Sequence, residues 1–491
     1  MSTTLHTLIV GAGFGGIGMA IALQRQGIRD VMVCEKSGDV GGCWRENTYP
    51  GAACDVPSHL YSFSFAPKPD WSRKFAPQPE ILAYLREVAR SHGVMPLVRF
   101  HTEVTSLRFV DTAQVWEATL ANGQTVRSAR FVVTACGQLS KPLVPRLPGL
   151  GDFQGEAFHS AHWRHDIDLT GKRVAVIGTG ASAIQFVPQI APKVAQLTVF
   201  QRSAPYVIPK PDRAYPAWEQ RLYARLPVLQ RLSRAWIYSA NEARALAFTR
   251  FTSLMGIFRM GFARNLAQQV PDAALRERLT PDYGLGCKRI LISNDFYPAM
   301  SRPNVRLVSQ GIAAVRPTGI ETADGQLHPA DVIVYGTGFA ATEFLTPMRV
   351  TGRNGLDLHT QWAQGAQAWL GMSVAGFPNF FMLYGPNTNL GHNSIVYMLE
   401  SQIEHIARCM RDLGSRRGGV GGGGATMEVL APRQNAFNAA LQQRMRRTVW
   451  ASGCTSWYQT AEGHSPINWP GFTLSYRWMT RRAGLKDYAV R

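Results

Sequence analysis

Short runs of apolar residues that end in glycine recur three times along the chain. They are Leu8 to Val10 before Gly11, Val174 to Ile177 before Gly178, and Val332 to Tyr335 before Gly336. Such a run is typical of a parallel strand that is buried on both faces. The pattern predicts an α/β protein with two Rossmann-like units of the βαβ kind, in which the third strand returns to the first unit.

The positions of these runs divide the chain. We expect the first unit over residues 1–146, the second over 147–332, and a second part of the first unit with a C-terminal segment over 333–491. Prolines at 142, 145 and 148 indicate that the segment between the first and the second unit is a linker.

Residues 213–280 interrupt the second unit with Arg- and Leu-rich segments of helical period. We expect a helical insertion that packs on its own domain. The wall of a substrate tunnel and a contact with a membrane surface are the alternatives for this insertion. A glycine-rich run at 418–424 lacks a phosphate-binding frame and predicts a flexible surface loop.

The composition is that of a folded enzyme rather than a disordered chain. Of 491 residues, 45% are hydrophobic and 17% are charged. No run of about 18 apolar residues occurs, so no transmembrane helix is predicted, and the first apolar run lacks the features of a signal peptide. Seven scattered cysteines show no metal-ligand spacing, so we expect reduced thiols, no metal and a cytoplasmic location.

The chain is strongly basic, because 52 Lys and Arg residues against 33 Asp and Glu residues give a formal charge of +19. This excess raises nucleic acid or an anionic membrane as a partner. The basic residues are spread along the chain, however, and two anionic dinucleotides would use part of the excess. We therefore expect small-molecule partners, no nucleic acid, and at most a weak membrane-surface contact.

The first apolar run leads into a dinucleotide-binding fingerprint. A helical run at 17–26 follows the fingerprint, and its N-terminus can receive a pyrophosphate. Glu35 follows the next strand about 20 residues later, where its carboxylate can accept hydrogen bonds from both ribose hydroxyls. The predicted glycine contacts are Gly11, Gly13, Gly15 and Gly16.

A second fingerprint follows the second apolar run. Its predicted contacts are Gly178, Gly180, Ala181 and Ser182, with Ala183 at the last position of the frame. The next strand, at 197–200, ends without an acid and is followed by Arg202 and Ser203. An arginine there can bind a 2′-phosphate, so the sequence favours NADPH over NADH.

Two dinucleotides in one chain imply that one cofactor brings electrons and the other uses them. A dithiol reductase would need a redox-active cysteine pair, and no C-x-x-C pair occurs in the sequence. We therefore expect the electrons to reach oxygen or a bound substrate.

Two longer motifs resemble a known family. Phe153-x-Gly155-x-x-x-His159-x-x-x-Trp163 matches the signature shared by Baeyer-Villiger monooxygenases and flavin-containing monooxygenases, with Arg164 where the stricter form has Pro or Asp. The stretch Gly41-Gly42-Cys43-Trp44, with Tyr49-Pro50-Gly51 and Asp55, is similar to the motif that separates Baeyer-Villiger enzymes from N- and S-oxidising relatives.

The resemblance implies an enzyme that uses FAD, NADPH and O2 to convert ketones to esters or lactones through a flavin C4a-peroxide, and that also oxidises sulfides. FAD would bind residues 1–146 and 333–491, and NADPH would bind 147–332. An N- or S-oxygenating flavin monooxygenase is the alternative within the class. A membrane- or nucleic-acid-associated redox sensor is the alternative from another class.

Oxygen insertion beside a carbonyl needs a permanent positive charge near the anionic peroxide and the developing alkoxide. Lys288 and Arg289 resemble the family's Lys-Arg pair, in which the arginine enters the flavin site and the lysine meets the 2′-phosphate. We predict that Arg289 and Asp55 are the catalytic pair, with Asp55 orienting the guanidinium.

The resemblance adds further positions. Gln138 would lie beside the nicotinamide, and Asn387 and Ile395 would face the flavin from a loop and a helix N-terminus. Trp457 would close over NADP, and His159 would couple the domains rather than attack substrate. The remaining predicted cofactor-binding residues are Gly42, Cys43, Trp44, Tyr61, Val104 and Gln185.

Overall fold

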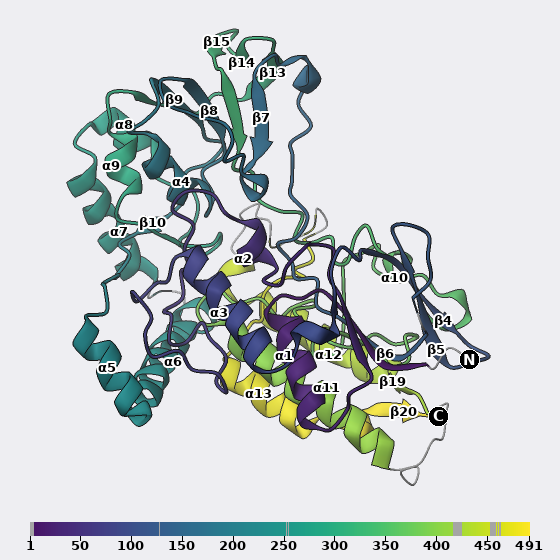
Figure 1. Cartoon of the computed structure of the whole chain (residues 1–491). Helices are drawn as coiled ribbons and strands as arrows, with labels where there is room; N and C mark the ends of the chain where they lie inside the picture. Colours follow the sequence, from purple (N-terminus) through teal and green to yellow (C-terminus); the bar gives the residue numbers. More distant parts are fainter. Residues whose placement is uncertain are drawn as a thin grey trace.

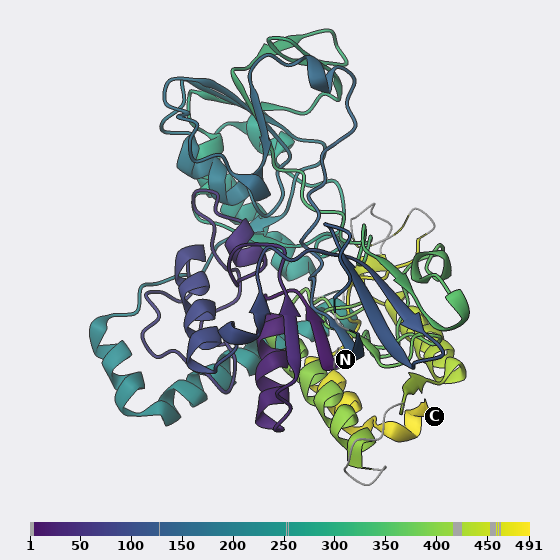
Figure 2. The same cartoon turned by 45° about the vertical axis from the view of Figure 1, so that its right-hand side comes forward.

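Two separate sheets organise the computed structural model, which describes residues 4–126, 128–251, 253, 255–415, 425–451, 458, 460 and 463–491. One sheet lies at the top of Figure 1, above a body that holds the other sheet and the C-terminal helices, and Figure 2 shows the same separation. The predicted loop at 418–424 and Trp457 lie outside the described residues.

The first sheet is mixed and runs in the order β17-β4-β5-β6-β1-β2-β3, with β18 paired to β6. Its strands are β1 (Leu5–Val10), β2 (Val31–Cys34), β3 (Val98–Arg99), β4 (Val104–Val110), β5 (Val115–Leu120), β6 (Ala129–Thr134), β17 (Arg349–Thr351) and β18 (Phe380–Met382). Helix α1 (Phe14–Arg25) follows β1 and packs against α11 (Ile395–Ser415). Because β1 lies between β6 and β2, the fingerprint turn between β1 and α1 lies in the interior of the sheet and not at an edge.

The second sheet is wholly parallel, in the order β12-β9-β8-β16-β7. Its strands are β7 (Glu156–His159), β8 (Arg173–Ile177), β9 (Gln196–Phe200), β12 (Val305–Val308) and β16 (Val332–Tyr335). Helix α4 (Ala183–Ile190) packs against α9 (Phe296–Met300) beside this sheet. A small antiparallel sheet, β13 (Ile312–Arg316), β14 (Gly319–Thr322) and β15 (Leu327–Pro329), extends it.

The prediction that the third apolar run returns to the first unit is wrong. That run is β16, which pairs with β8 and β7 in the second sheet. An apolar run shows that a strand is buried but does not show which sheet it joins. Strands β17 and β18 make the return instead, by pairing with β4 and β6.

The predicted insertion is helical and consists of α5 (Ala217–Arg225), α6 (Pro227–Thr249), α7 (Met255–Gln269) and α8 (Ala273–Arg278). Helix α7 packs on its own domain, against α9 and β10 (Val207–Ile208). The expectation of packing on its own domain is wrong for α6, whose inward polar side chains reach the first domain. Gln230 Nε2 donates to the carbonyl of Lys68 at 2.6 Å, and Arg234 donates to the carbonyl of His59 at 2.7 Å.

The remaining elements join or cover these layers. They are α2 (Cys43–Glu46), α3 (Gln78–Ser91), β11 (Leu291–Ile292), α10 (Leu358–Gln361), β19 (Met427–Val429), α12 (Ala431–Met445), α13 (Thr473–Arg482) and β20 (Tyr488–Val490). Within the described part of the chain, no helix is both long and apolar enough to cross a bilayer.

Gly16 is the position of α1 that most strictly excludes a side chain. A Cβ there would overlap the carbonyl oxygen of Gly11. We predict that Gly16→Ala lowers the free energy of unfolding by about 1–3 kcal/mol, because the start of α1 must shift. Urea denaturation measures this change. Gly414→Ala is the control, since a Cβ at Gly414 meets no atom within 4 Å. Equal stability of the two variants would contradict this packing.

Candidate active site

The first fingerprint forms a bare backbone turn at the end of β1. Gly11 has a φ of +103°, and a Cβ there would lie 2.7 Å from the carbonyl oxygen of Ala135, just after β6. Gly13 faces Gly42, because a Cβ on Gly42 would lie 3.1 Å from the Cα of Gly13. Because neither Gly13 nor Gly42 has a side chain, the backbone of the turn stays accessible, and a pyrophosphate can approach it closely.

Glu35 is buried beside this turn. Its carboxylate accepts hydrogen bonds from the backbone amides of Ala12 at 2.8 Å and Ser37 at 2.9 Å. The amide of Thr102, two residues before Val104, donates to the Glu35 carbonyl at 2.8 Å. Each carboxylate oxygen keeps a lone pair that can accept a ribose hydroxyl, so the position fits the predicted role.

Aromatic side chains line the turn where the Baeyer-Villiger-like motif meets it. Trp44 Nε1 donates to the Tyr61 hydroxyl at 3.1 Å, and the Tyr61 ring lies 5.2 Å from the ring of Phe14, the first residue of α1. Cys43, between Gly42 and Trp44, is exposed. The predicted residues of this motif therefore gather at the first fingerprint.

The second fingerprint repeats the same geometry. Gly178 has a φ of +105°, and a Cβ there would lie 2.5 Å from the carbonyl oxygen of Gly336, the residue that follows β16. A Cβ on Gly180 would lie 3.9 Å from the carbonyl oxygen of Gly336, without a clash, and Ala181 and Ser182 lead directly into α4. Thus Gly336 packs against the second fingerprint, as Ala135 packs against the first.

Two cationic side chains gather at the end of β9. Lys288 Nζ donates to Ser203 Oγ at 2.9 Å. Burial lowers the pKa of Lys288, and the nearby Arg202 guanidinium lowers it further, while Asp282 opposes them. Arg202 is exposed. Like charges held this close repel each other, and a phosphate dianion would relieve that repulsion through charge-assisted hydrogen bonds.

Arg289 and Asp55 form an ion pair between the two domains, in which Arg289 Nη2 donates to Asp55 Oδ2. The charge of Asp55 raises the pKa of Arg289 well above its usual value. Burial would raise the pKa of Asp55, but the charge and hydrogen bond of Arg289 outweigh burial and hold that pKa below its usual value. The guanidinium is therefore permanently charged and fixed in place.

Lys210 is a residue of this site that sequence reasoning missed. Strand β10 pairs in parallel with β11, with Val207 opposite Leu291, and the backbone amide of Lys210, two residues after β10, donates to Asn294 Oδ1 at 2.9 Å. Lys210 lies close enough to Asp55 to help lower its pKa. The local signal was weak, because a two-residue strand leaves almost no pattern in the sequence.

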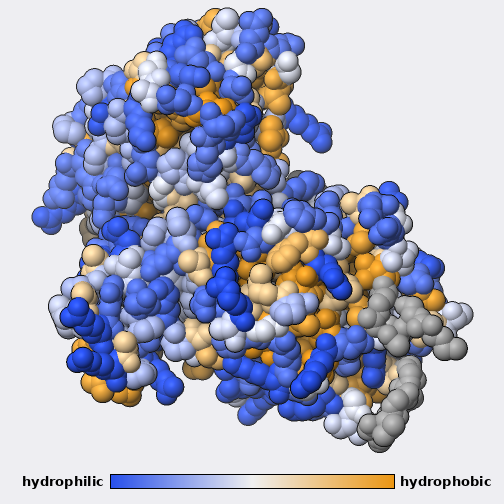
Figure 3. Space-filling view, in the orientation of Figure 1, coloured by the Kyte–Doolittle hydropathy of each residue, from blue (hydrophilic) through white to orange (hydrophobic). Residues whose placement is uncertain are grey.

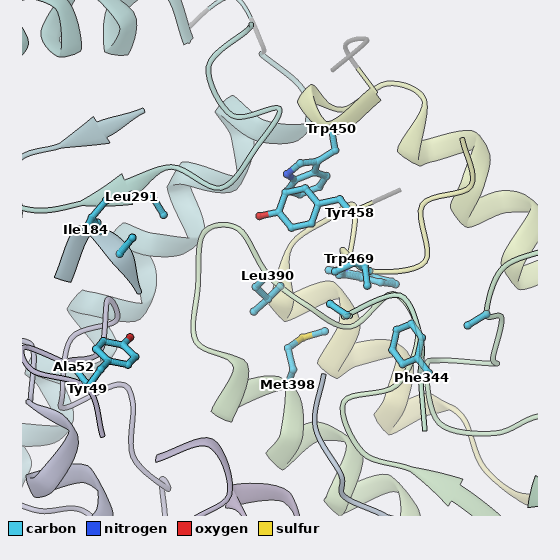
Figure 4. Packing of buried hydrophobic residues seen from close by; sticks show 14 of the residues in the cluster. Tyr49, Ala52, Ile184, Leu291, Phe344, Leu390, Met398, Trp450, Tyr458 and Trp469 are labelled. Atoms are coloured by element: carbon cyan, nitrogen blue, oxygen red, sulfur yellow. The ribbon is translucent and has the colours of Figure 1, made fainter. Parts of the chain in front are cut away.

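Aromatic residues that include Tyr384 and Tyr458 form a wall beside the ion pair. Burial raises the pKa of Tyr458 to about 12, although the neighbouring Arg289 lowers it. Burial also raises the pKa of Tyr384 above its usual value. Figure 4 shows Trp450 and Tyr458 side by side with Trp469 and Leu390 next to them, and Tyr49 and Ala52 across the view. Both phenols stay neutral, so Arg289 is the charged member of this trio.

Two predicted amide side chains each leave a buried oxygen without a hydrogen-bond partner among the described residues. Gln138 Nε2 donates to the carbonyl of Tyr384 at 3.1 Å, and Asn387 Nδ2 donates to the carbonyl of Ser465 at 2.7 Å, but both side-chain oxygens are orphaned. Buried polar atoms of this kind are normally satisfied. A bound cofactor that donates hydrogen bonds fits both positions.

Gln185 bonds across the domain boundary, whereas the hydrogen bond of His159 is local. The Tyr49 hydroxyl donates to Gln185 Oε1 at 2.9 Å, and Gln185 Nε2 donates to the Ala53 carbonyl at 3.0 Å. His159 Nδ1 accepts from the amide of Ala161 at 3.1 Å. Gln185 thus links α4 to the first domain, and any cofactor contact of Gln185 stays a prediction. Ile395 begins α11.

The expectation that every cysteine is a reduced thiol is wrong for Cys287, which is disulfide-bonded. Spacing along the sequence does not show which cysteines meet in the fold. The free cysteines among the described residues are Cys34, Cys43, Cys54, Cys136 and Cys409.

Comparisons with known proteins agree with this geometry. Residues 5–242 match the model of the flavin-binding monooxygenase-like family. A Baeyer-Villiger monooxygenase of Streptomyces coelicolor is 46% identical over 99% of this chain and 92% of its own, and one of Pseudomonas aeruginosa is 45% identical over 98% and 90%. Among solved structures, OTEMO in complex with FAD and NADP gives a TM-score of 0.90 at 29% identity, covering both chains completely. Steroid monooxygenase bound to NADP gives 0.88 at 33% identity over 99% of each chain.

We predict that Asp55→Asn lowers the free energy of unfolding by about 1–3 kcal/mol, because it leaves the Arg289 charge without its carboxylate. About a third of each side chain is exposed, 30% for Arg289 and 33% for Asp55, so the loss is smaller than for a fully buried pair. The folded pKa of Asp55 is lowered. The pair therefore contributes stability above the usual carboxyl pKa of about 3.9, and this contribution is lost as the pH falls through the lowered pKa.

Denaturation at several pH values measures the difference between wild type and this variant. The control is Asp166→Asn, which removes the carboxylate of the exposed Arg164–Asp166 pair and should leave stability unchanged at neutral pH. A difference for Asp55→Asn that persists undiminished at the lowest pH would refute this assignment.

Proposed function

The chain belongs to the Baeyer-Villiger monooxygenases of the flavin-binding monooxygenase-like family, and we propose that Arg289 supplies the fixed charge that directs oxygen insertion into a ketone. The enzyme is an NADPH-dependent flavoprotein, and similar solved structures bind FAD and NADP. FAD supplies the activation of O2 with electrons from NADPH. The residues of this chain supply binding, orientation and electrostatics.

The observation that carries the proposal is the Arg289–Asp55 ion pair beside the aromatic wall. Insertion of oxygen next to a carbonyl places negative charge on oxygen atoms, and a preorganised cation stabilises that charge best where water is excluded. A guanidinium keeps its proton in such surroundings and offers several donors. Lys210 is a second cation near Asp55, and its Nζ lies 3.9 Å from the carboxylate of Asp212.

The residues of the first fingerprint would hold FAD. Gly11, Gly13 and Gly42 would admit its pyrophosphate, and Glu35 would accept the ribose hydroxyls. The side-chain oxygens of Gln138 and Asn387 are buried and accept no hydrogen bond from any described residue. A hydrogen-bond donor of the bound FAD would fill each of these positions.

The second fingerprint would hold NADPH. Gly178 and Gly180 would admit the pyrophosphate, and Arg202, Ser203 and Lys288 would bind the 2′-phosphate. NADH lacks this phosphate, so the proposed site explains a preference between the two nicotinamide cofactors. We further propose that the enzyme oxidises sulfides as well as ketones and that it is cytoplasmic.

Arg289→Ala should separate NADPH consumption from product formation. We predict that NADPH oxidation continues while the yield of ester falls about a hundredfold or more, which is the size of effect expected when one electrostatic donor is removed. Assays that follow NADPH by absorbance and ester by chromatography measure both quantities. Arg302→Ala is the control, because Arg302 is exposed in the turn after α9. Near-normal ester formation by Arg289→Ala would overturn the proposal.

Replacing the 2′-phosphate contacts should change cofactor selectivity. We predict that Arg202→Gln raises the KM for NADPH about tenfold or more and leaves the KM for NADH nearly unchanged, because a charge-assisted hydrogen bond is lost only with NADPH. Lys288→Met should act in the same direction. Steady-state kinetics with both cofactors measure the effect, and equal changes for NADPH and NADH would exclude this site.

A further inference from the structure

Helix α6 carries an apolar stripe that faces solvent. Val228, Leu232 and Trp236 follow each other at intervals of four residues, and their exposed fractions are 57%, 60% and 75%. Over this first half of the helix the inward side is polar, with Gln230 and Arg234 bonded to the first domain, whereas Phe248 near the other end is buried and apolar. This distribution is the reverse of that expected for a helix at the surface of a globular protein.

The neighbouring helix α13 also exposes two large apolar side chains, Leu474 and Trp478, whose exposed fractions are 60% and 54%. The first turn of α13 lies against α6, because Thr473 Oγ1 and the Leu474 amide donate to the Glu242 carboxylate at 2.8 and 2.9 Å. Both helices lie along the lower edge of the molecule in Figure 1. We name Val228, Leu232, Trp236, Leu474 and Trp478 the apolar face. Figure 3 shows hydrophobic side chains exposed at the lower left of the molecule, where Figure 1 places the end of the α5–α6 hairpin.

Positive charge surrounds the apolar face. Residues 217–269 contain eight arginines and only two acids, Glu219 and Glu242. Both acids are used inside the protein, since Glu219 pairs with Arg213 and Glu242 bonds to α13. On α6, Arg231 and Arg244 flank the stripe and both are exposed. On α13, the Arg482 guanidinium lies 3.7 Å from the centre of the Trp478 ring.

We propose that the apolar face docks on an anionic lipid surface. Exposed tryptophan and aliphatic side chains flanked by arginines are the composition of helices that lie in a membrane interface, where the apolar groups enter the acyl boundary and the cations meet lipid phosphates. A second copy of this chain is a poorer occupant, because a two-fold contact would bring arginines against arginines. The net charge of +19 adds attraction of the whole molecule toward such a surface.

Helix α6 connects this face to the active site. It runs from Trp236 to Phe248 over about 18 Å. The Phe248 ring stacks on Trp450 at 6.0 Å, and a Cβ on Gly286, three residues before Arg289, would lie 3.5 Å from Phe248. Docking through α6 therefore holds the aromatic end of the site close to the bilayer, where apolar ketones dissolve.

Sedimentation with lipid vesicles tests the proposal on the full-length flavoenzyme. We expect binding to vesicles of phosphatidylcholine mixed with phosphatidylglycerol, and far less binding to phosphatidylcholine alone. Binding should weaken as salt is added, because screening shortens the reach of the arginines. Absence of binding to the mixed vesicles, or equal binding to both kinds, would overturn the proposal.

Two variants separate the apolar and the cationic contributions. Trp236→Ser combined with Trp478→Ser should weaken vesicle binding about tenfold or more, and Arg231→Gln combined with Arg244→Gln should weaken it about fivefold per arginine. Leu327→Ser and Arg349→Gln are matched controls, because these residues are exposed on β15 and β17, away from the face.

Each variant must retain the turnover of wild type in vesicle-free buffer, so that a failure to bind lipid is distinct from a failure of the proposed catalysis. Size-exclusion chromatography tests for a dimer. If wild type is a dimer and Trp236→Ser is a monomer, a second copy of the chain occupies the apolar face, and the proposal is overturned. Binding to duplex DNA in place of vesicles would do the same.

Discussion

The ion pair between Arg289 and Asp55 is the interaction on which the rest of the site depends. It joins a loop of the first domain to a segment that follows the helical insertion of the second, so it can form only when the two domains are packed together. The carboxylate raises the pKa of the guanidinium, and the surrounding phenols are held neutral by burial. The result is a cation that no physiological change of pH can remove.

Much of this arrangement could be predicted because its causes are local. Each fingerprint needs a glycine where its backbone lies too close to another backbone segment for a side chain to fit, as Gly11 lies against Ala135 and Gly178 against Gly336. This requirement appears in the sequence as a motif of six residues. Glu35 and the pair Arg202 and Ser203 follow from the same logic, since they end or adjoin strands, whereas Lys288 was predicted from the family resemblance alone. The α/β fold with two such sheets is confirmed, as is membership of the family.

The misses have long-range causes. Strand β16 is as apolar as any central strand, and only its pairing with β7 and β8 shows that it belongs to the second sheet. Lys210 lies near Asp55 although 155 positions separate them in the sequence, and Cys287 forms a disulfide that spacing did not indicate. Helix α6 was expected on its own domain, but its polar side chains find carbonyl partners across the domain boundary. The proposed lipid contact is made by the other side of α6, where apolar side chains are exposed to solvent.

A crystal structure of the protein with FAD and NADP bound tests the central claim most directly. The account predicts that the Arg289 guanidinium, still paired with Asp55, lies within hydrogen-bond reach of the reactive edge of the flavin or of the nicotinamide cofactor beside it. A guanidinium that points away from both cofactors in the complex, with Asp55 paired elsewhere, would contradict it.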